Sequence, residues 1–188
     1  MSYKNIGQVR QQKLTYLFHL LDVNDNGQLT ETDFLTLVQA LATMRGYPEH
    51  SGAYNSLKRS WMYVWQNIFK LSDLDLSDAV DLTEWLKFFD HAVGDEAYYS
   101  ALVAPLEESM IALMDTDGRN LITRTDYQQL TTIWKVRAED IDLVFSKLDE
   151  NGDEALNDAE VGLAIRQFFT SDEPDTDGNY FFGDYTRA

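Results

Sequence analysis

The sequence predicts an all-α protein built from four helix–loop–helix units in two paired lobes. Apolar residues recur at helical spacing through most of the 188 residues, which indicates amphipathic helices. Four polar stretches of twelve residues interrupt these helices, each beginning with aspartate, at residues 22–33, 73–84, 115–126 and 149–160. A unit that returns at intervals of tens of residues indicates an internal repeat, and we expect a compact fold.

The composition is strongly acidic, with 32 Asp and Glu against 15 Lys and Arg and a net charge of −17. No basic patch stands out to meet phosphates, so we expect no nucleic-acid partner. The charge suits a protein that takes up several divalent cations, since bound metal relieves repulsion between carboxylates. The absence of cysteine excludes disulfides, zinc–thiolate sites and a cysteine nucleophile.

Membrane attachment is not expected. No stretch approaches the roughly 18 apolar residues of a transmembrane helix. Residues 1–8 lack the apolar run of a signal peptide, and Ser2 stands where N-myristoylation would need glycine. We therefore expect a cytoplasmic protein without a membrane span, and we expect a monomer.

Loop 1, residues 22–33, has the spacing of an EF-hand calcium loop. Calcium takes about 6–8 oxygen ligands at roughly 2.3–2.6 Å, and a tight loop can supply them by alternation. Gly27 holds the sixth place, where the chain must turn with positive φ, and Leu29 holds the eighth place and faces a core. The repeat weakens the alternative interpretation, a polar turn between two helices. The ligand candidates are Asp22, Asn24, Asn26, Thr30, Asp33 and the carbonyl of Gln28.

Loop 2, residues 73–84, has carboxylates at four ligand places, which favours a divalent cation over a solvated acidic turn. Asp78 replaces the sixth-place glycine and can reach the left-handed region at roughly 1 kcal/mol. The ligand candidates are Asp73, Asp75, Ser77, Asp81, Glu84 and the carbonyl of Ala79.

Loop 4, residues 149–160, has good ligand chemistry, while Glu154 in the glycine place leaves the backbone fit open. Its ligand candidates are Asp149, Asn151, Asp153, Asn157, Glu160 and the carbonyl of Ala155.

Loop 3, residues 115–126, departs from the pattern because Arg119 holds the fifth place. Arginine has no acceptor atom and a permanent positive charge. We therefore expect a structural loop that pairs with its neighbour, and calcium in loops 1, 2 and 4. The weaker candidates in loop 3 are Asp115, Asp117, Thr123, Asp126 and the carbonyl of Leu121, with Asn120 in the sixth place.

The twelfth residue differs between the loops. Glu84 and Glu160 are long enough to give two oxygens, whereas Asp33 is shorter and gives fewer. A lower coordination number suits magnesium, so loop 1 is predicted to be a mixed calcium and magnesium site.

The loops should work in pairs through short ribbons between their eighth-place residues, Leu29 with Val80 and Ile122 with Leu156. This pairing predicts an N-terminal pair in residues 1–94 and a C-terminal pair in residues 95–170.

The tail, residues 171–188, ends in an aromatic run, and we expect it to fold back onto the cores of both pairs.

The chain resembles the sarcoplasmic calcium-binding protein group of the EF-hand superfamily, which includes calexcitin and the luciferin-binding proteins. The resemblance rests on the four loops, on Trp61 and Trp65 between loops 1 and 2, on Asn120-Leu-Ile in loop 3, and on the ending Asn179-Tyr-Phe-Phe-Gly-Asp. It implies a compact two-lobed helical protein with ligand roles in loops 1, 2 and 4.

Two functions remain open. The first is an intracellular calcium buffer or sensor; a sensor would bind a protein target, and only five Met slightly favour the buffer. The second is a carrier that releases a small apolar ligand when calcium binds, as luciferin-binding proteins do, with tryptophans lining a cavity. Enzymatic activity is not expected, because no Ser/His/Asp signature or phosphate-cradling loop is visible.

Overall fold

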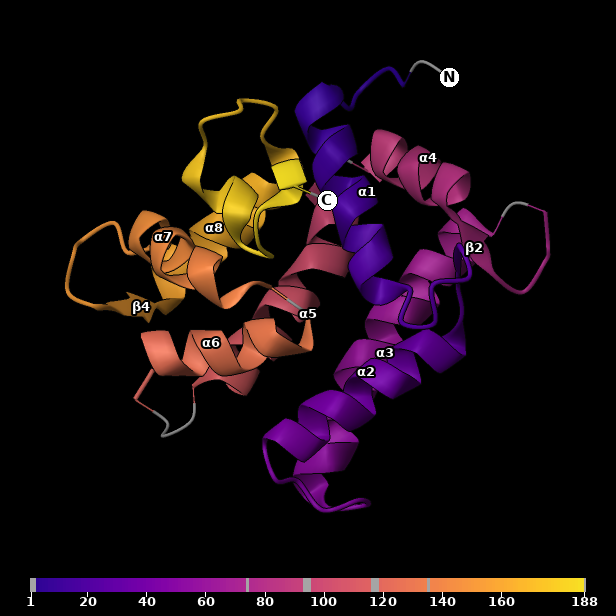
Figure 1. Ribbon diagram of the computed structural model, residues 1–188. Coiled ribbons are helices and arrows are strands. Elements are labelled where there is room, and N and C mark those ends of the chain that lie inside the picture. The colour runs from indigo at the N-terminus through magenta and orange to yellow at the C-terminus, as the bar shows by residue number, and fades with distance from the viewer. Residues whose placement is uncertain (1–2, 74, 93–95, 116–118, 135, 188) are drawn as a thin grey trace.

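The computed structural model describes residues 3–73, 75–92, 96–115, 119–134 and 136–187, with side chains except at 69–71, 96, 98–102 and 187. Within these residues the chain forms eight α-helices, four short strands and two 3-10 turns (Figure 1). The helices are α1 (Gln8–Leu21), α2 (Glu31–Met44), α3 (Gly52–Ser72), α4 (Leu82–Ala92), α5 (Glu96–Met114), α6 (Arg124–Ile133), α7 (Ala138–Leu148) and α8 (Asp158–Thr170). The predicted all-α arrangement of four helix–loop–helix units is confirmed.

Two antiparallel ribbons join the loops in pairs. The strands are β1 (Gln28–Leu29), β2 (Val80–Asp81), β3 (Leu121–Thr123) and β4 (Ala155–Asn157). In the β1–β2 ribbon Leu29 lies opposite Val80, and in the β3–β4 ribbon Ile122 lies opposite Leu156. All four side chains are fully buried. The predicted pairing of the eighth-place residues is therefore confirmed.

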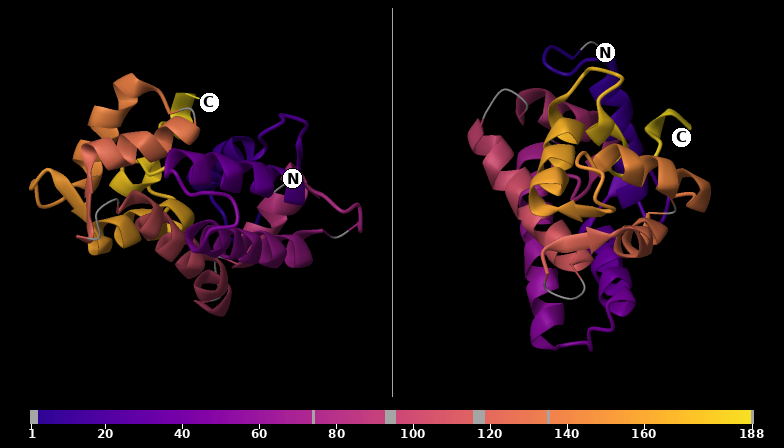
Figure 2. Two further views of the ribbon diagram at one scale, coloured as in Figure 1. Left: turned by 90° about the horizontal axis from the view of Figure 1, so that it is seen from below. Right: turned by 90° about the vertical axis from the view of Figure 1, so that its left-hand side faces the viewer.

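The N-terminal half of the chain, with α1–α4, and the C-terminal half, with α5–α8, lie side by side and share one core (Figure 2). Buried apolar side chains from all eight described helices form a single cluster, and aromatic rings make many of its contacts. The expected division between residues 1–94 and 95–170 falls at residues outside the described part of the chain. None of the described helices combines the length and the apolar character that crossing a membrane requires.

The C-terminal segment, residues 171–187, folds back onto the helices as its aromatic residues predict. Two 3-10 turns shape it, η1 (Asp177–Tyr180) and η2 (Tyr185–Arg187). Phe181 and Phe182 are buried, and the Phe182 ring contacts Trp134 and Phe168 with ring centroids 5.1 and 4.7 Å apart. The Tyr127 hydroxyl donates to the Phe181 carbonyl at 2.8 Å. The segment is therefore part of the core.

Helix α1 lies near this segment (Figure 1). The contact between them includes a fully buried lysine of α1. The Lys13 Nζ donates to the carbonyls of Gln167 (3.2 Å) and Ser171 (2.8 Å) and to Asn179 Oδ1 (2.5 Å). These three acceptors match the three N–H donors of an ammonium group. Burial lowers the pKa of Lys13 from 10.5 to about 7; Asp172 opposes this change and Arg10 adds to it.

This buried lysine predicts an unusual pH dependence of stability. Between about pH 7 and pH 10 the unfolded chain keeps a lysine proton that the folded chain releases, so the free energy of unfolding should rise with pH. Above this window the trend should reverse, because burial raises the pKa of Tyr16 to about 12 and the unfolded chain loses that proton first. Urea unfolding at several pH values, without calcium, measures the slope.

The variant Lys13→Met should lose the rise between pH 7 and pH 10. Lys58→Met is the matched control, because Lys58 is exposed on α3 and its replacement should leave the slope unchanged. Equal slopes in the parent chain and in Lys13→Met would contradict the prediction.

Candidate metal sites

The aspartate at the first place organises each loop. In loop 1 the Asp22 carboxylate accepts hydrogen bonds from the N–H groups of Asn26 (3.1 Å) and Gly27 (2.7 Å). The equivalent donor–acceptor pairs, at 3.0–3.2 Å, are Ser77–Asp73, Arg119–Asp115, Asn120–Asp115, Asp153–Asp149 and Glu154–Asp149. Each carboxylate thus draws the loop backbone into a ring around itself.

The sixth residue of every loop has a positive φ. The angles are +79° at Gly27, +62° at Asp78, +55° at Asn120 and +68° at Glu154. The expected turn is therefore confirmed in all four loops. At Glu154, where the sequence leaves the fit open, the backbone takes the loop conformation at a cost of roughly 1–2 kcal/mol.

The fourth residue of loops 1, 2 and 4 also has a positive φ, which the sequence pattern did not predict. The angles are +56° at Asp25, +61° at Leu76 and +71° at Gly152. Leu76 is 85% exposed, so this leucine carries backbone strain without contributing to the core. In the sequence, Gly152 indicated this turn, because glycine commonly occupies positions with positive φ.

The twelfth residue ties each loop to the helix that follows it. Its carboxylate accepts from the N–H of the ninth residue in all four loops, in the pairs Thr30–Asp33 (3.0 Å), Asp81–Glu84 (3.1 Å), Thr123–Asp126 (3.0 Å) and Asn157–Glu160 (2.9 Å). This is a capping box, and its Ser/Thr/Asp/Asn-x-x-acid pattern was visible in the sequence. The ninth residue therefore serves as helix cap in each loop.

Loop 2 brings three of its four predicted carboxylates together. Ligand oxygens of Asp73, Asp75 and Glu84, at the first, third and twelfth places, all lie within 4.8 Å of one another. The Ser77 hydroxyl donates to the Ala79 carbonyl at 3.2 Å, so two further candidates meet at the same loop. Three anionic groups at this separation repel by on the order of 1–3 kcal/mol a pair, and a divalent cation between them would offset that repulsion.

Loop 1 is closed by a bond between two of its candidates. The Asn24 Nδ2 donates to Asp33 Oδ1 at 2.8 Å, which joins the third place to the twelfth. The Asn26 Oδ1 accepts from the N–H of Gln28 at 2.9 Å. A half-turn of the Asn24 amide would present its oxygen instead, so the same geometry suits a cation at the centre of the loop.

Loop 4 is closed in a similar way. Glu160 Oε1 accepts from the N–H of Asn151 at 3.3 Å, across the loop from the twelfth place to the third. Asn151 Oδ1 accepts from Asp153 N–H, and Asp153 Oδ1 accepts from Ala155 N–H. Hydrogen bonds therefore link all six candidate ligand residues of this loop.

Loop 3 keeps the frame without a complete ligand set. Asp115 accepts from the N–H groups of Arg119 and Asn120, and Asp126 Oδ2 accepts from the Thr123 hydroxyl at 2.5 Å. Asp117 lies outside the described residues. The Leu121 side chain is partly exposed. The frame thus persists around an arginine that cannot bind a cation.

One neighbour of loop 1 was missed. His19, one turn before Asp22 on α1, has a ring nitrogen within 4.8 Å of carboxylate oxygens of Asp22 and Asp25. His19 precedes the loop and Asp25 holds its fourth place, which is not a ligand place, so only the three-dimensional arrangement joins them.

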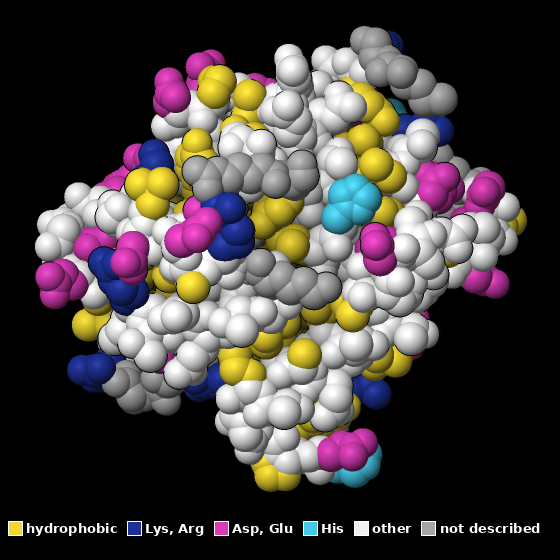
Figure 3. Space-filling model, in the orientation of Figure 1, with side chains coloured by type: hydrophobic (Ala, Val, Ile, Leu, Met, Phe, Trp, Pro, Cys, Tyr) yellow, Lys and Arg dark blue, Asp and Glu magenta, His cyan; other side chains and the backbone are white. Residues whose placement is uncertain are grey.

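On the face shown in Figure 3, groups of acidic side chains lie at the two opposite edges where Figure 1 places loops 2 and 4, and others lie elsewhere on that face. These edges lie at the ends of the two ribbons.

Helix–loop–helix units that pair through short ribbons define the EF-hand fold, and solved structures agree with this assignment. The sarcoplasmic calcium-binding protein of amphioxus matches with a TM-score of 0.77 at 17% identity, over 95% of this chain and 98% of that chain. A calcium-binding protein of Streptomyces coelicolor matches with a TM-score of 0.72 at 20% identity, over 86% and 98%. The coelenterazine-binding protein of Renilla muelleri matches with a TM-score of 0.70 at 14% identity, over 95% and 99%.

No protein-family model matches the sequence, and no curated protein matches it. At these identities the likeness establishes the fold: this chain has the four-unit EF-hand fold of the compact calcium-binding proteins.

Proposed function

We propose that the protein binds calcium ions through loops 1, 2 and 4 and acts as an intracellular calcium buffer or sensor. The observation that carries this proposal is the convergence of Asp73, Asp75 and Glu84 oxygens within 4.8 Å, at the first, third and twelfth places of an EF-hand loop. The bound ion would join the helix that enters each loop to the helix that leaves it.

Each metal-binding loop supplies its own ligands. The proposed ligands are, in loop 1, Asp22, Asn24, Asn26, Asp33 and the Gln28 carbonyl; in loop 2, Asp73, Asp75, Ser77, Glu84 and the Ala79 carbonyl; in loop 4, Asp149, Asn151, Asp153, Glu160 and the Ala155 carbonyl. Loop 3 is proposed to remain without calcium, because Arg119 puts a positive charge at a ligand place.

The partners, the location and the oligomeric state that we propose for the protein follow from the same calcium-binding role. Its charge of −17 disfavours nucleic acid, and free divalent cations become its principal partners. We propose a cytoplasmic, monomeric, non-catalytic protein. Its buried aromatic core and docked C-terminal segment favour a buffer, because they leave little apolar surface for a target.

Calorimetric calcium titration of single variants tests the proposal. Asp22→Ala, Asp73→Ala and Asp149→Ala should each reduce the number of bound ions by one, because each removes a first-place carboxylate. Asp115→Ala is the matched control and should leave the number of ions unchanged. Three ions in all of these variants, or no binding in the parent chain, would contradict the assignment.

Loop 1 should also take magnesium, because the shorter Asp33 offers fewer oxygens than Glu84 or Glu160. In a calcium titration repeated with millimolar magnesium, the apparent affinity of loop 1 should fall more than that of loops 2 and 4. Replacement of Asp33 by Glu should remove the difference. Unchanged calcium binding at loop 1 in magnesium would disprove the mixed site.

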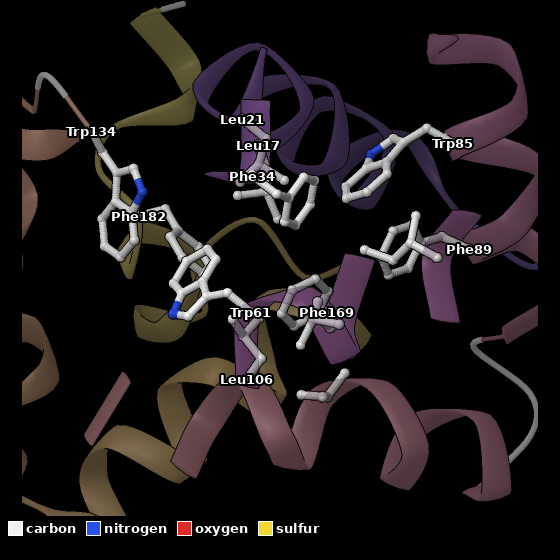
Figure 4. A pocket seen from close by; sticks show the side chains of 13 residues that line it. Leu17, Leu21, Phe34, Trp61, Trp85, Phe89, Leu106, Trp134, Phe169 and Phe182 are labelled. Carbon is white, nitrogen blue, oxygen red and sulfur yellow. The ribbon is translucent and has the colours of Figure 1, made fainter. Parts of the chain in front are cut away.

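A second candidate function is carriage of a small apolar ligand, and one observation favours it. The junction of the halves holds an apolar cavity whose lining includes Trp61, Trp85, Trp134 and Phe182 (Figure 4). The indole nitrogens of Trp61 and Trp134 are buried there without a hydrogen-bond partner among the described residues. Such donors suit a ligand with an acceptor oxygen, and one structural neighbour is named for binding coelenterazine.

The size of the cavity opposes this second function. Its volume is about 30 Å³, whereas ligand pockets commonly reach about 300 Å³ or more. A carrier would therefore need the C-terminal segment or the aromatic rings to move apart. For this reason calcium buffering is the preferred function.

An apolar dye such as anilinonaphthalene sulfonate separates the alternatives in one experiment. A buffer should give low dye fluorescence both with and without calcium, because its apolar surface stays buried. A rise on adding calcium would replace the buffer with a sensor. Dye that binds without calcium and is released by it would support the carrier. Asp73→Ala tests whether any change follows from loop 2.

A further inference from the structure

Three polar side chains on one stripe of α1 bind the C-terminal segment. Arg10, Lys13 and Tyr16 follow one another at spacings of three residues, so they share a face of the helix. Lys13 Nζ binds Ser171, Gln167 and Asn179, and the Tyr16 hydroxyl donates to the Phe182 carbonyl at 3.2 Å. We name this set of contacts, together with Asp172, the clasp.

The clasp also caps the first turn of α1. Gly7, the residue before the helix, makes no side-chain cap of its own. Asp172 replaces it, because its carboxylate accepts from the N–H groups of Gly7 and Arg10, both at 3.1 Å, and from Arg10 Nε at 2.5 Å. A Cβ on Gly7 would lie 2.5–2.9 Å from that carboxylate, so only glycine permits the contact.

The centre of the clasp is buried and fully bonded. Lys13 and Asn179 are both 0% exposed. Asn179 accepts from Lys13 and donates through Nδ2 to the carbonyls of Glu173 (2.8 Å) and Pro174 (3.2 Å). Because every bond in this group is directional and water is excluded, α1 cannot shift along its axis without breaking several of them.

The clasp lies between two metal loops that no ribbon joins. Helix α1 ends at Leu21, directly before Asp22 of loop 1. Helix α8 carries Glu160 of loop 4 in its first turn and ends at Thr170, directly before Ser171. The ribbons join loop 1 to loop 2 and loop 3 to loop 4. The clasp thus connects loop 1 to loop 4 through α1 and α8, by contacts between the N-terminal part of α1 and the C-terminal end of α8.

We propose that the clasp couples calcium binding in loop 1 to calcium binding in loop 4, across the two halves of the protein. This inference rests on the proposed calcium function of both loops. An ion in loop 1 fixes the orientation of α1, and the clasp transmits that orientation to α8 and so to Glu160. The coupling acts equally in both directions, because it is a free energy shared by the two sites.

The test follows two backbone amides by NMR during calcium titration. The Gly27 N–H donates to Asp22 and reports loop 1, and the Glu154 N–H donates to Asp149 and reports loop 4. With the clasp intact, Asp22→Ala should weaken calcium binding in loop 4 by about fivefold or more. In the Lys13→Met background the same replacement should change the loop 4 affinity by less than about twofold, since the clasp is broken.

Two controls keep the result decisive. Lys58→Met, on the exposed face of α3, should leave the full coupling in place. If Lys13→Met does not fold, as judged by circular dichroism, Asp172→Asn and Tyr16→Phe loosen the clasp without emptying the core and should each reduce the coupling.

The outcomes separate this inference from the proposed function. Amides of Gly27 and Glu154 that do not respond to calcium would overturn the calcium function itself. If both amides respond to calcium but Asp22→Ala leaves the calcium affinity of loop 4 unchanged, the proposed coupling alone would be overturned. Coupling that persists unchanged in the clasp variants would assign it to another route and would also overturn the inference.

Discussion

The backbone conformation of each loop depends on the hydrogen bonds of its first-place aspartate, and the positions of the ligand atoms depend on that conformation. In each loop the first-place aspartate accepts N–H groups from the fifth or sixth residue, and this closes the backbone into a ring. The closed ring forces the sixth residue into the left-handed region and brings the eighth residue into its ribbon. Loop 3 shows that the frame and the ligand set are separable, because it keeps the ring around Arg119.

This separation explains how much of the site the sequence predicted. The alternation of polar and apolar places within twelve residues is local, so the ribbons and the turn at Gly27 follow from the pattern, whereas Glu154 in the glycine place left the turn of loop 4 open until the structure showed it. The strained Leu76 did not follow, because leucine carries no signal for positive φ. The capping box was visible in Thr30-Glu-Thr-Asp33, yet its role was hidden behind the metal-ligand pattern.

Contacts between distant residues were beyond prediction for a different reason. Asp172 caps a helix that begins more than 160 residues earlier in the chain. Lys13 occupies a polar place in the sequence and yet is fully buried. Both facts depend on the angle at which α1 crosses the end of α8, and a hydrophobic pattern specifies which face is buried but not that angle. The buried aromatic tail was predictable because apolar surface alone required it.

Helix α1 contacts helices of both halves of the protein. The Trp85 Nε1 of α4 donates to the Leu14 carbonyl of α1 at 2.9 Å, while the clasp joins the same helix to α8. In Figure 1, α4 and α8 lie on opposite sides of α1. Helix α1 therefore relates loop 2, through α4, to loop 4, through α8, in addition to carrying loop 1.

Stability alone does not account for the lysine at the centre of the clasp. A buried ammonium loses its hydration, and an apolar side chain of similar volume would fill the same space at lower cost. What the lysine adds is direction: three acceptors from α8 and the C-terminal segment fix one position of Nζ, and an apolar contact would tolerate several. A lysine that lowers stability but fixes the relative position of α1 and α8 is expected if calcium binding in loop 1 affects calcium binding in loop 4 through these two helices.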